Sequence, residues 1–256
     1  LNAIKRAGDA GKTVILCTGR NLAELNAFTE IIPGLRYLDC VSGACVYDLK
    51  EKKTLYSQAL DPGIVKKLME FALEEEAMIH VLSERSIVQR DQQSHMADFH
   101  MGIYQTMFDK ITDKLENIYN SFCQEPFPVL KLNLYHKDEY SRARTVERIK
   151  AAGLETALAL AESTSLECSA KGIDKGVGLK KLCEHLRLPL EQTIAVGDAD
   201  NDTMALKTAG LSIAMGNATE PVKALADVIV ADCDHNGCAE AIDKYLLAEN
   251  RPQKQV

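Results

Sequence analysis

Residues 193–206 read TIAVGDADNDTMAL, and they indicate the fold class of the whole chain. The apolar run 193–196 has the length of a buried strand, and apolar residues return at helical spacing from Met204. The three aspartates between these two elements therefore lie at the carboxyl end of a strand, where open α/β sheets bind their ligands. Carboxylates so close together repel one another unless a cation joins them, and their oxygen atoms suit Mg²⁺. The stretch predicts a magnesium site that works together with an anion such as phosphate.

Strands and helices alternate on both sides of this stretch, which predicts a parallel sheet. The strands that we expect are 13–17, 37–41, 46–47, 193–196, 211–214 and 228–230. Helices are expected over residues 21–32 and 175–186, after Asp202, from Pro221 and from Cys238.

The middle of the chain has a different pattern. Segments 129–135 and 156–160 alternate with period two, which predicts antiparallel strands with one solvent-exposed face. Further elements expected here are helices at 62–77, near 107–121 and at 141–152, and a strand at 78–82. We therefore predict an α/β fold, with a Rossmann-like parallel-sheet core formed by residues 1–50 and 168–256 and an α+β domain inserted at 51–167.

The composition is that of an ordinary globular protein, with 256 residues, 46% hydrophobic and 26% charged. A net charge of -7 without any block of Lys or Arg argues against a nucleic-acid or anionic membrane partner. No apolar stretch reaches the roughly 20 residues of a membrane span, and no signal peptide is present, so we expect a cytoplasmic protein. The eight cysteines are scattered without paired spacing, which predicts free thiols. The sequence does not indicate the oligomeric state.

Two segments outside the acidic stretch are candidates for holding an anion. Thr18 and Gly19 follow a predicted strand and precede a helix, so a hydroxyl and a backbone amide are available there. The alternative is that Thr18 or Asn21 only caps that helix. Lys175 follows Asp174, the expected cap of the next helix, and a cation in the first turn opposes the helix dipole unless an anion offsets it. The alternative is a solvated surface lysine.

Within the acidic stretch, Asp198 is the strongest candidate for a metal ligand. It ends a predicted buried strand, where an unpaired carboxylate would cost several kcal/mol. Asp202 has the alternative role of a helix cap, and Asp200 that of a solvated carboxylate. Ser42 and the glycine after it end another strand, where they either line the same crevice or form a plain turn.

In chain order, these segments resemble the motifs of the haloacid dehalogenase-like phosphatases, specifically the Cof-type branch with a large C2-type cap. The segment VILCTGR at 14–20 resembles the second family motif, DKG at 174–176 the third, and GDADND at 197–202 the fourth. AMGNA at 214–218 resembles a further stretch typical of the branch. The insert 51–167 lies where that branch carries its cap.

The resemblance implies that an aspartate attacks phosphorus and that a second aspartate, two residues on, protonates the leaving group. The family carries both in a DxDGT motif on a strand, which we expect upstream of Leu1, because the chain starts without Met inside a predicted helix. Without that strand, two strand edges of the core would be unpaired, so we expect either a gap at these edges or another segment that fills it. Residues 228–234 also combine an apolar run with DxD, but no Gly-Thr pair follows, so we do not expect a circular permutation.

The resemblance also assigns roles to the residues of the site. The residues implied to contact phosphate are Thr18, Gly19, Ser42, Lys175 and Asn201. Ser42 stands where the family usually has Asn, so its side chain is shorter than expected there. Asp198 is implied to bind Mg²⁺ and Asp202 to support the metal. Thr18, Lys175 and Asp198 are the implied catalytic residues.

Together these features predict a Mg²⁺-dependent phosphomonoesterase acting on a small phosphorylated metabolite, with a sugar phosphate as the expected class. A phosphosugar mutase shares the architecture and stays an alternative. A non-catalytic phosphometabolite sensor is another, because no nucleophile is identified in the chain. A receiver-type phosphoacceptor domain is disfavoured by the large insert. The exact substrate and pathway do not follow from the sequence.

Overall fold

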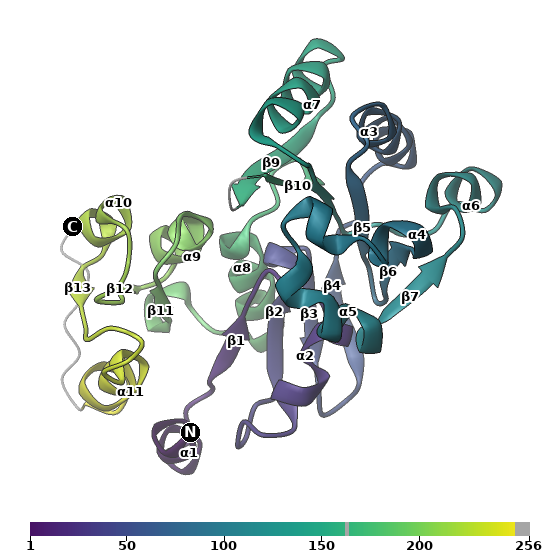
Figure 1. Cartoon of the computed structure of the whole chain (residues 1–256). Helices are drawn as coiled ribbons and strands as arrows, with labels where there is room; N and C mark the ends of the chain where they lie inside the picture. The colour runs from purple at the N-terminus through teal and green to yellow at the C-terminus, as the bar shows by residue number, and fades with distance from the viewer. Residues whose placement is uncertain (162–163, 249–256) are drawn as a thin grey trace. The chain divides into compact units, whose positions relative to one another are not determined.

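The computed structural model describes residues 1–161 and 164–248, which form two compact units (Figure 1). The first unit contains residues 1–19, 27–57 and the chain from Asp174 onward. The second contains residues 20–26 and 58–173. The chain thus leaves the first unit after Ser57 and returns to it at Asp174, a few residues after the predicted boundaries at 50/51 and 167/168. The short segment 20–26 joins the second unit, which the sequence did not indicate.

The described part of the first unit contains two sheets. One has four strands in the order β1 (Ile15–Cys17), β2 (Tyr37–Cys40), β3 (Cys45–Asp48) and β4 (Lys53–Ser57). The other has three parallel strands in the order β11 (Ile194–Gly197), β12 (Leu211–Ala214) and β13 (Val228–Ile229). β1 and β2 are parallel, whereas β3 and β4 add an antiparallel extension. The parallel core predicted from the sequence is confirmed for these five parallel strands.

β1 and β11 are both outer strands of their sheets. Among the described residues, no strand pairs with their second edges. Val196 of β11 is 39% exposed and Cys17 of β1 is also exposed, although both belong to apolar runs. Of the two predicted outcomes, the described residues show unpaired strand edges and no other strand that fills the gap.

Helices of the first unit pack against these sheets. The α-helices are α1 (Asn2–Asp9), α2 (Leu22–Thr29, which continues from the second unit), α8 (Lys175–Leu186), α9 (Thr203–Thr208), α10 (Glu220–Leu225) and α11 (Gly237–Ala241). Short helical turns occur at η1 (Val41–Gly43), η4 (Leu190–Gln192), η5 (Asp200–Asp202) and η6 (Ile242–Leu246). Leu182 of α8 packs against Tyr37 and Val46 of the four-stranded sheet. Leu211 and Ile213 of β12 pack with Ala241 of α11.

The second unit is built on one sheet of six described strands in the order β7-β6-β5-β8-β10-β9. Its strands are β5 (Met78–Leu82), β6 (Ser86–Gln89), β7 (Thr112–Leu115), β8 (Lys131–Tyr135), β9 (Thr156–Ala161) and β10 (Ser165–Ala170). All pairs are antiparallel except β6 with β7, so the predicted antiparallel layer is confirmed. The α-helices are α3 (Pro62–Glu74), α4 (Arg90–Gln93), α5 (Gln105–Ile111), α6 (Ile118–Gln124) and α7 (Glu139–Ala151), with short turns η2 (Met96–Phe99) and η3 (Gly102–Tyr104).

A large apolar core lies on one face of this sheet. Leu68 of α3, Phe122 of α6 and Ile149 of α7 belong to the same buried cluster as Leu132 and Leu134 of β8.

In the described chain, no helix is long and apolar enough to cross a membrane.

Two predictions for this unit are wrong. The single helix expected near 107–121 is instead α5, the strand β7 and α6, because β7 pairs with β6 in a segment whose sequence lacks a clear period. The solvent-exposed face expected for β8 is buried, as are all five residues of the strand. Lys131 is buried because its ammonium pairs with Glu167 Oε2 at 3.0 Å, and Asn133 Nδ2 donates to the Tyr135 hydroxyl at 3.2 Å. β4, β6 and β10 were not predicted.

Candidate active site

Thr18 lies at the carboxyl end of β1 and is held by backbone hydrogen bonds. Its amide donates to Asp39 O at 2.8 Å, and the amide of Ser42 donates to Thr18 O at 3.0 Å. Helix α2 is capped by Asn21, whose Oδ1 accepts from the Glu24 amide at 3.1 Å while Glu24 Oε2 accepts from the Asn21 amide at 3.0 Å. This reciprocal pair is a capping box, so Thr18 is not the cap of the helix. Gly19 follows Thr18 in the bend after β1.

The turn η1, which contains Ser42, has unusual backbone geometry. Val41 and Ser42 have φ values of 54° and 56°, in the left-handed region that a β-branched residue rarely adopts. Gly43 follows with φ 94°, and a Cβ at this position would lie 1.9 Å from Asp174 O. Such strain persists where surrounding contacts enforce it and often marks functional sites. The turn connects the Thr18 segment directly to the start of α8.

Lys175 begins α8 and is buried, with 6% of the residue exposed. Its Nζ lies 2.6 Å from Asp202 Oδ1 and 3.3 Å from Asn201 Oδ1. Asp174 caps the helix as predicted, since its Oδ1 accepts from the Gly176 amide at 2.8 Å. The alternative of a solvated surface lysine is therefore wrong. A buried ammonium is fixed at this end of the sheet, where it can neutralise an anion.

Asp202 anchors both this lysine and its own loop. While Oδ1 accepts from Lys175, Oδ2 accepts from the amides of Asp198 at 3.0 Å and Ala199 at 3.2 Å. A Cβ on Gly197 would lie 2.5 Å from Asp202 Cβ, so only glycine fits where the strand meets the loop. Both carboxylate oxygens of Asp202 are thus engaged by protein donors.

Asp198 is exposed, which corrects the argument that burial demands a partner for it. The reason is that β11 is an outer strand, so its carboxyl end is not enclosed. Asp198 Oδ2 accepts from Asn217 Nδ2 at 2.9 Å, and Asn217 Oδ1 accepts from the Cys233 amide at 3.0 Å. Asn217 thereby orients the carboxylate. The motif containing Asn217 was noticed in the sequence, but no role for this residue was predicted.

The donor set is compatible with Mg²⁺ held largely by water. In the described residues, no three His, Cys, Asp or Glu side chains converge on a common point. Asp198 nevertheless presents an accessible carboxylate oriented by Asn217, and Mg²⁺ typically uses one or two protein carboxylates and keeps several waters. The residues present are therefore compatible with a hydrated Mg²⁺ ion at the Asp198 carboxylate.

Asp39, a residue that the sequence reasoning missed, lies directly beneath this site. It is 2% exposed, and its Oδ2 accepts a hydrogen bond from Cys17 Sγ at 3.1 Å. Within the described chain, its Oδ1 has no hydrogen-bond partner. Burial raises the pKa of Asp39 to about 7, although the Cys17 hydrogen bond and the Lys175 charge act in the opposite direction. A single aspartate inside the apolar run 37–41 was the available sequence signal.

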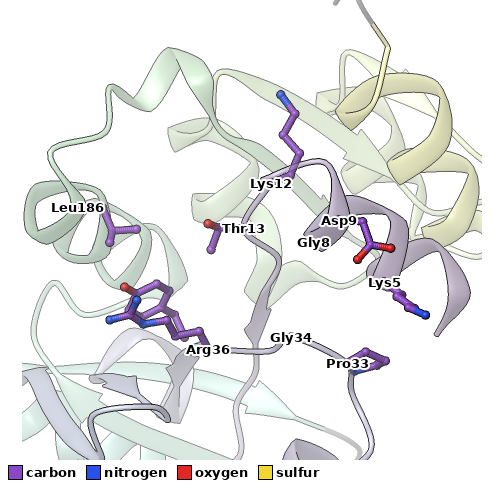
Figure 2. Close-up of a pocket in the computed structure, with 10 residues that line it drawn as sticks. Lys5, Gly8, Asp9, Lys12, Thr13, Pro33, Gly34, Arg36 and Leu186 are labelled. Carbon is purple, nitrogen blue, oxygen red and sulfur yellow. The ribbon is translucent and has the colours of Figure 1, made fainter.

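A separate cavity of about 520 Å³ lies at the other end of the same strands (Figure 2). Thr13 and Arg36, which line it, precede β1 and β2, whereas Thr18 follows β1. The Arg36 guanidinium is already paired with Asp48, with 2.8 Å between Arg36 Nη2 and Asp48 Oδ2. Figure 2 shows the Lys12 ammonium pointing away from Thr13. This cavity is not part of the candidate site.

The structure brings the predicted site residues together at one end of the first unit's strands. Hydrogen bonds and close contacts run from Thr18 through the Ser42 turn to the start of α8. At the start of α8, Lys175 donates hydrogen bonds to Asn201 and Asp202, and Asp202 also accepts from the Asp198 amide.

The sequence profile of the haloacid dehalogenase-like hydrolases matches residues 1–242. The chain belongs to this family. Phosphatase YwpJ of Bacillus subtilis is 25% identical over 283 aligned residues, which cover 96% of this chain and 92% of that protein. HMP-PP phosphatase of Enterobacter sp. is 25% identical over 98% of this chain and 90% of that protein. A solved haloacid dehalogenase-like hydrolase from Bacteroides thetaiotaomicron has a TM-score of 0.81 and 24% identity, covering 95% of this chain and 90% of that one. The resemblance and the fold predicted from the motifs are confirmed.

Proposed function

We propose that this haloacid dehalogenase-like hydrolase is a Mg²⁺-dependent phosphomonoesterase of a small phosphorylated metabolite, with a sugar phosphate as the expected class. The observation that carries the proposal is the buried Lys175 ammonium, 2.6 Å from Asp202 Oδ1. Several of the relatives are named as phosphatases, and the small molecules in their names differ and include HMP-PP and pyridoxal phosphate. Their variety supports the reaction type more strongly than it supports any one substrate.

In this proposal, Thr18 and Lys175 hold the phosphoryl oxygens. Their interactions strengthen as negative charge develops in the transition state, which is how fixed donors accelerate phosphoryl transfer. Asn201 and Asp202 hold the lysine in place, so little reorganisation is needed when substrate binds. Gly19 and the Ser42 turn would contribute backbone groups near the phosphate. When bound by Asp198, Mg²⁺ would neutralise phosphate charge.

We place the attacking aspartate on a strand preceding Leu1, between β1 and β11. The unpaired edges of these two strands support this position. The DxD sequence at 232–234 is not a candidate for that strand, since β13 pairs with β12 on the side away from β11. Asp232 Oδ1 instead accepts from the amides of Asp234 at 3.0 Å and His235 at 2.9 Å, so it stabilises a turn.

The experiment measures phosphate release by the full natural polypeptide from a panel of sugar phosphates, with and without Mg²⁺. Asp198→Ala should abolish the Mg²⁺-dependent activity. Asp200→Ala is the matched control, because Asp200 lies in the same loop and, within the described part of the chain, its Oδ1 accepts only a long, 3.4 Å hydrogen bond from Thr219 Oγ1. Full activity of Asp198→Ala would refute the metal assignment. Phosphate-ester binding without any turnover would favour the sensor alternative, and transfer of phosphate between positions of a sugar would favour a mutase.

A further inference from the structure

Asp39 is a carboxyl group at a buried position of the four-stranded sheet, where an apolar side chain would be expected. All four residues of β2 are buried, and Asp39 lies in register between Cys17 of β1 and Val46 of β3. A buried carboxyl normally requires several hydrogen bonds, yet only the Cys17 thiol donates to this one, and its Oδ1 is unpartnered among the described residues. Such an exception calls for a functional or structural reason.

The carboxyl of Asp39 contacts the same helix face that carries Lys175. A Cβ on Gly178 would lie 2.0 Å from Asp39 Oδ1, so the helix approaches the carboxyl with only hydrogen atoms between them. Gly178 is three residues after Lys175, and residues at this spacing share one face of a helix. The Asp39 backbone also accepts the hydrogen bond that positions Thr18. Asp39 is therefore linked to both residues proposed to hold phosphate.

We propose that Asp39 is a positioning residue whose charge sets the anion affinity of Lys175. As a neutral acid, it leaves the Lys175 ammonium to Asp202 and to a bound phosphate. Once ionised, it attracts the ammonium inward and repels the anion. This inference rests on the proposed role of Lys175 in phosphate binding.

The charged and titratable groups around Asp39 allow both forms near neutral pH. Burial raises its pKa to about 7, Cys17 from β1 and Lys175 from α8 lower it, and Asp174 from the start of α8 raises it. β3 contributes only Val46 in the paired position. Cys17 is exposed on one side, but the protein packed around its sulfur keeps water from the other side, and this desolvation together with the Asp39 charge raises the pKa of the thiol well above its usual value, so it stays a neutral donor. A change of the Asp39 charge is thus expected near pH 7, while its hydrogen-bond donor Cys17 stays neutral.

The test measures binding of sulfate to the full natural polypeptide by calorimetry between pH 6 and pH 8.5. Sulfate is the probe because inorganic phosphate changes its own charge in this range. For the wild type we expect the Kd to rise about tenfold across the range, the equivalent of one pKa unit of interaction. The isosteric variant Asp39→Asn should bind sulfate with little change over the same range.

Asp48→Asn is the matched control. Asp48 is also buried in this four-stranded sheet, but its hydrogen bonds outweigh the effect of burial and lower its pKa, with Arg36 as the main partner. It stays ionised throughout, so the variant should keep the wild-type pH dependence. In the wild type, infrared spectroscopy should also detect a protonated carboxyl at pH 6 that disappears at pH 8.5 and is absent from Asp39→Asn.

An unchanged pH dependence in Asp39→Asn would overturn the inference. If sulfate binds the wild type and Lys175→Ala abolishes binding, that result would leave the proposed phosphate site intact and refute only the role of Asp39. If sulfate does not bind the wild type at any pH, both the phosphate site and the inference built on it fail. If Asp39 had a purely structural role, Asp39→Asn would change the stability of the protein but would keep the pH dependence of sulfate binding, which would also overturn the inference.

Discussion

Replacing Asp39 with Asn should stabilise the protein relative to the wild type, and this gain in unfolding free energy should be larger at alkaline pH than at acidic pH. The pKa of Asp39 is raised from 3.8 to about 7, mainly by burial, so ionisation of this carboxyl opposes folding. The penalty begins as pH rises above the unfolded-state pKa and is complete above the folded-state pKa. Three pKa units correspond to roughly 4 kcal/mol, of which about 2.5 kcal/mol develops between pH 5 and pH 8.

The assay is urea denaturation of the wild type and Asp39→Asn at several pH values from 5 to 8. Other titrating groups contribute equally to both proteins, so the difference between their unfolding free energies isolates Asp39. We expect this difference to shift by about 2.5 kcal/mol in favour of the variant between pH 5 and pH 8. A difference that stays constant over this range would show that Asp39 is ionised in the folded protein throughout, and would refute the reasoning.

Three further predictions concern other sites. Gly178→Ala should destabilise the fold by about 1–3 kcal/mol in urea denaturation, since its Cβ would overlap the Asp39 carboxyl, whereas Gly8→Ala, with no atom within 4 Å, should not. Burial, aided by the Lys131 charge, lowers the pKa of His80 to about 3, so NMR should find a neutral imidazole at pH 5, and stability should fall as pH drops below 6.5. Asn217→Ala should weaken Mn²⁺ binding, measured by electron paramagnetic resonance, by about 10–100-fold, because Asn217 orients Asp198; unchanged affinity would contradict that role.

Periodicity predicted the parts of the fold in which local sequence and tertiary pairing agree. β1, β2, β11 and β12 are apolar runs bounded by turn residues, and the structure contains all four. β7 was missed because Thr112–Leu115 is mostly polar and becomes a strand only through its pairing with β6. The buried polar face of β8 was likewise unpredictable, since the partner of Lys131 is Glu167, on a strand 36 residues away in the sequence.

The site was predictable to the extent that motifs carried it. Spacing and residue type identified Thr18, Lys175 and Asp198, but not which groups each one contacts. Asp198 was expected to be buried, because an apolar run does not reveal that its strand is at the edge of a sheet. The close approach of Asp39 to α8 depends on Gly178, which is distant in sequence and has no local signature.

The central claim is that Lys175 holds a phosphoryl group during hydrolysis. The most direct test compares kcat/KM for a sugar phosphate in the full natural polypeptide carrying Lys175→Ala or Lys181→Ala, in the presence of Mg²⁺. Both lysines lie on α8, but the Lys181 side chain is 39% exposed and pairs with Glu184 at 2.8 Å. We predict a loss of about 100-fold or more for Lys175→Ala and little change for Lys181→Ala. Equal activity of the two variants would contradict the proposed function.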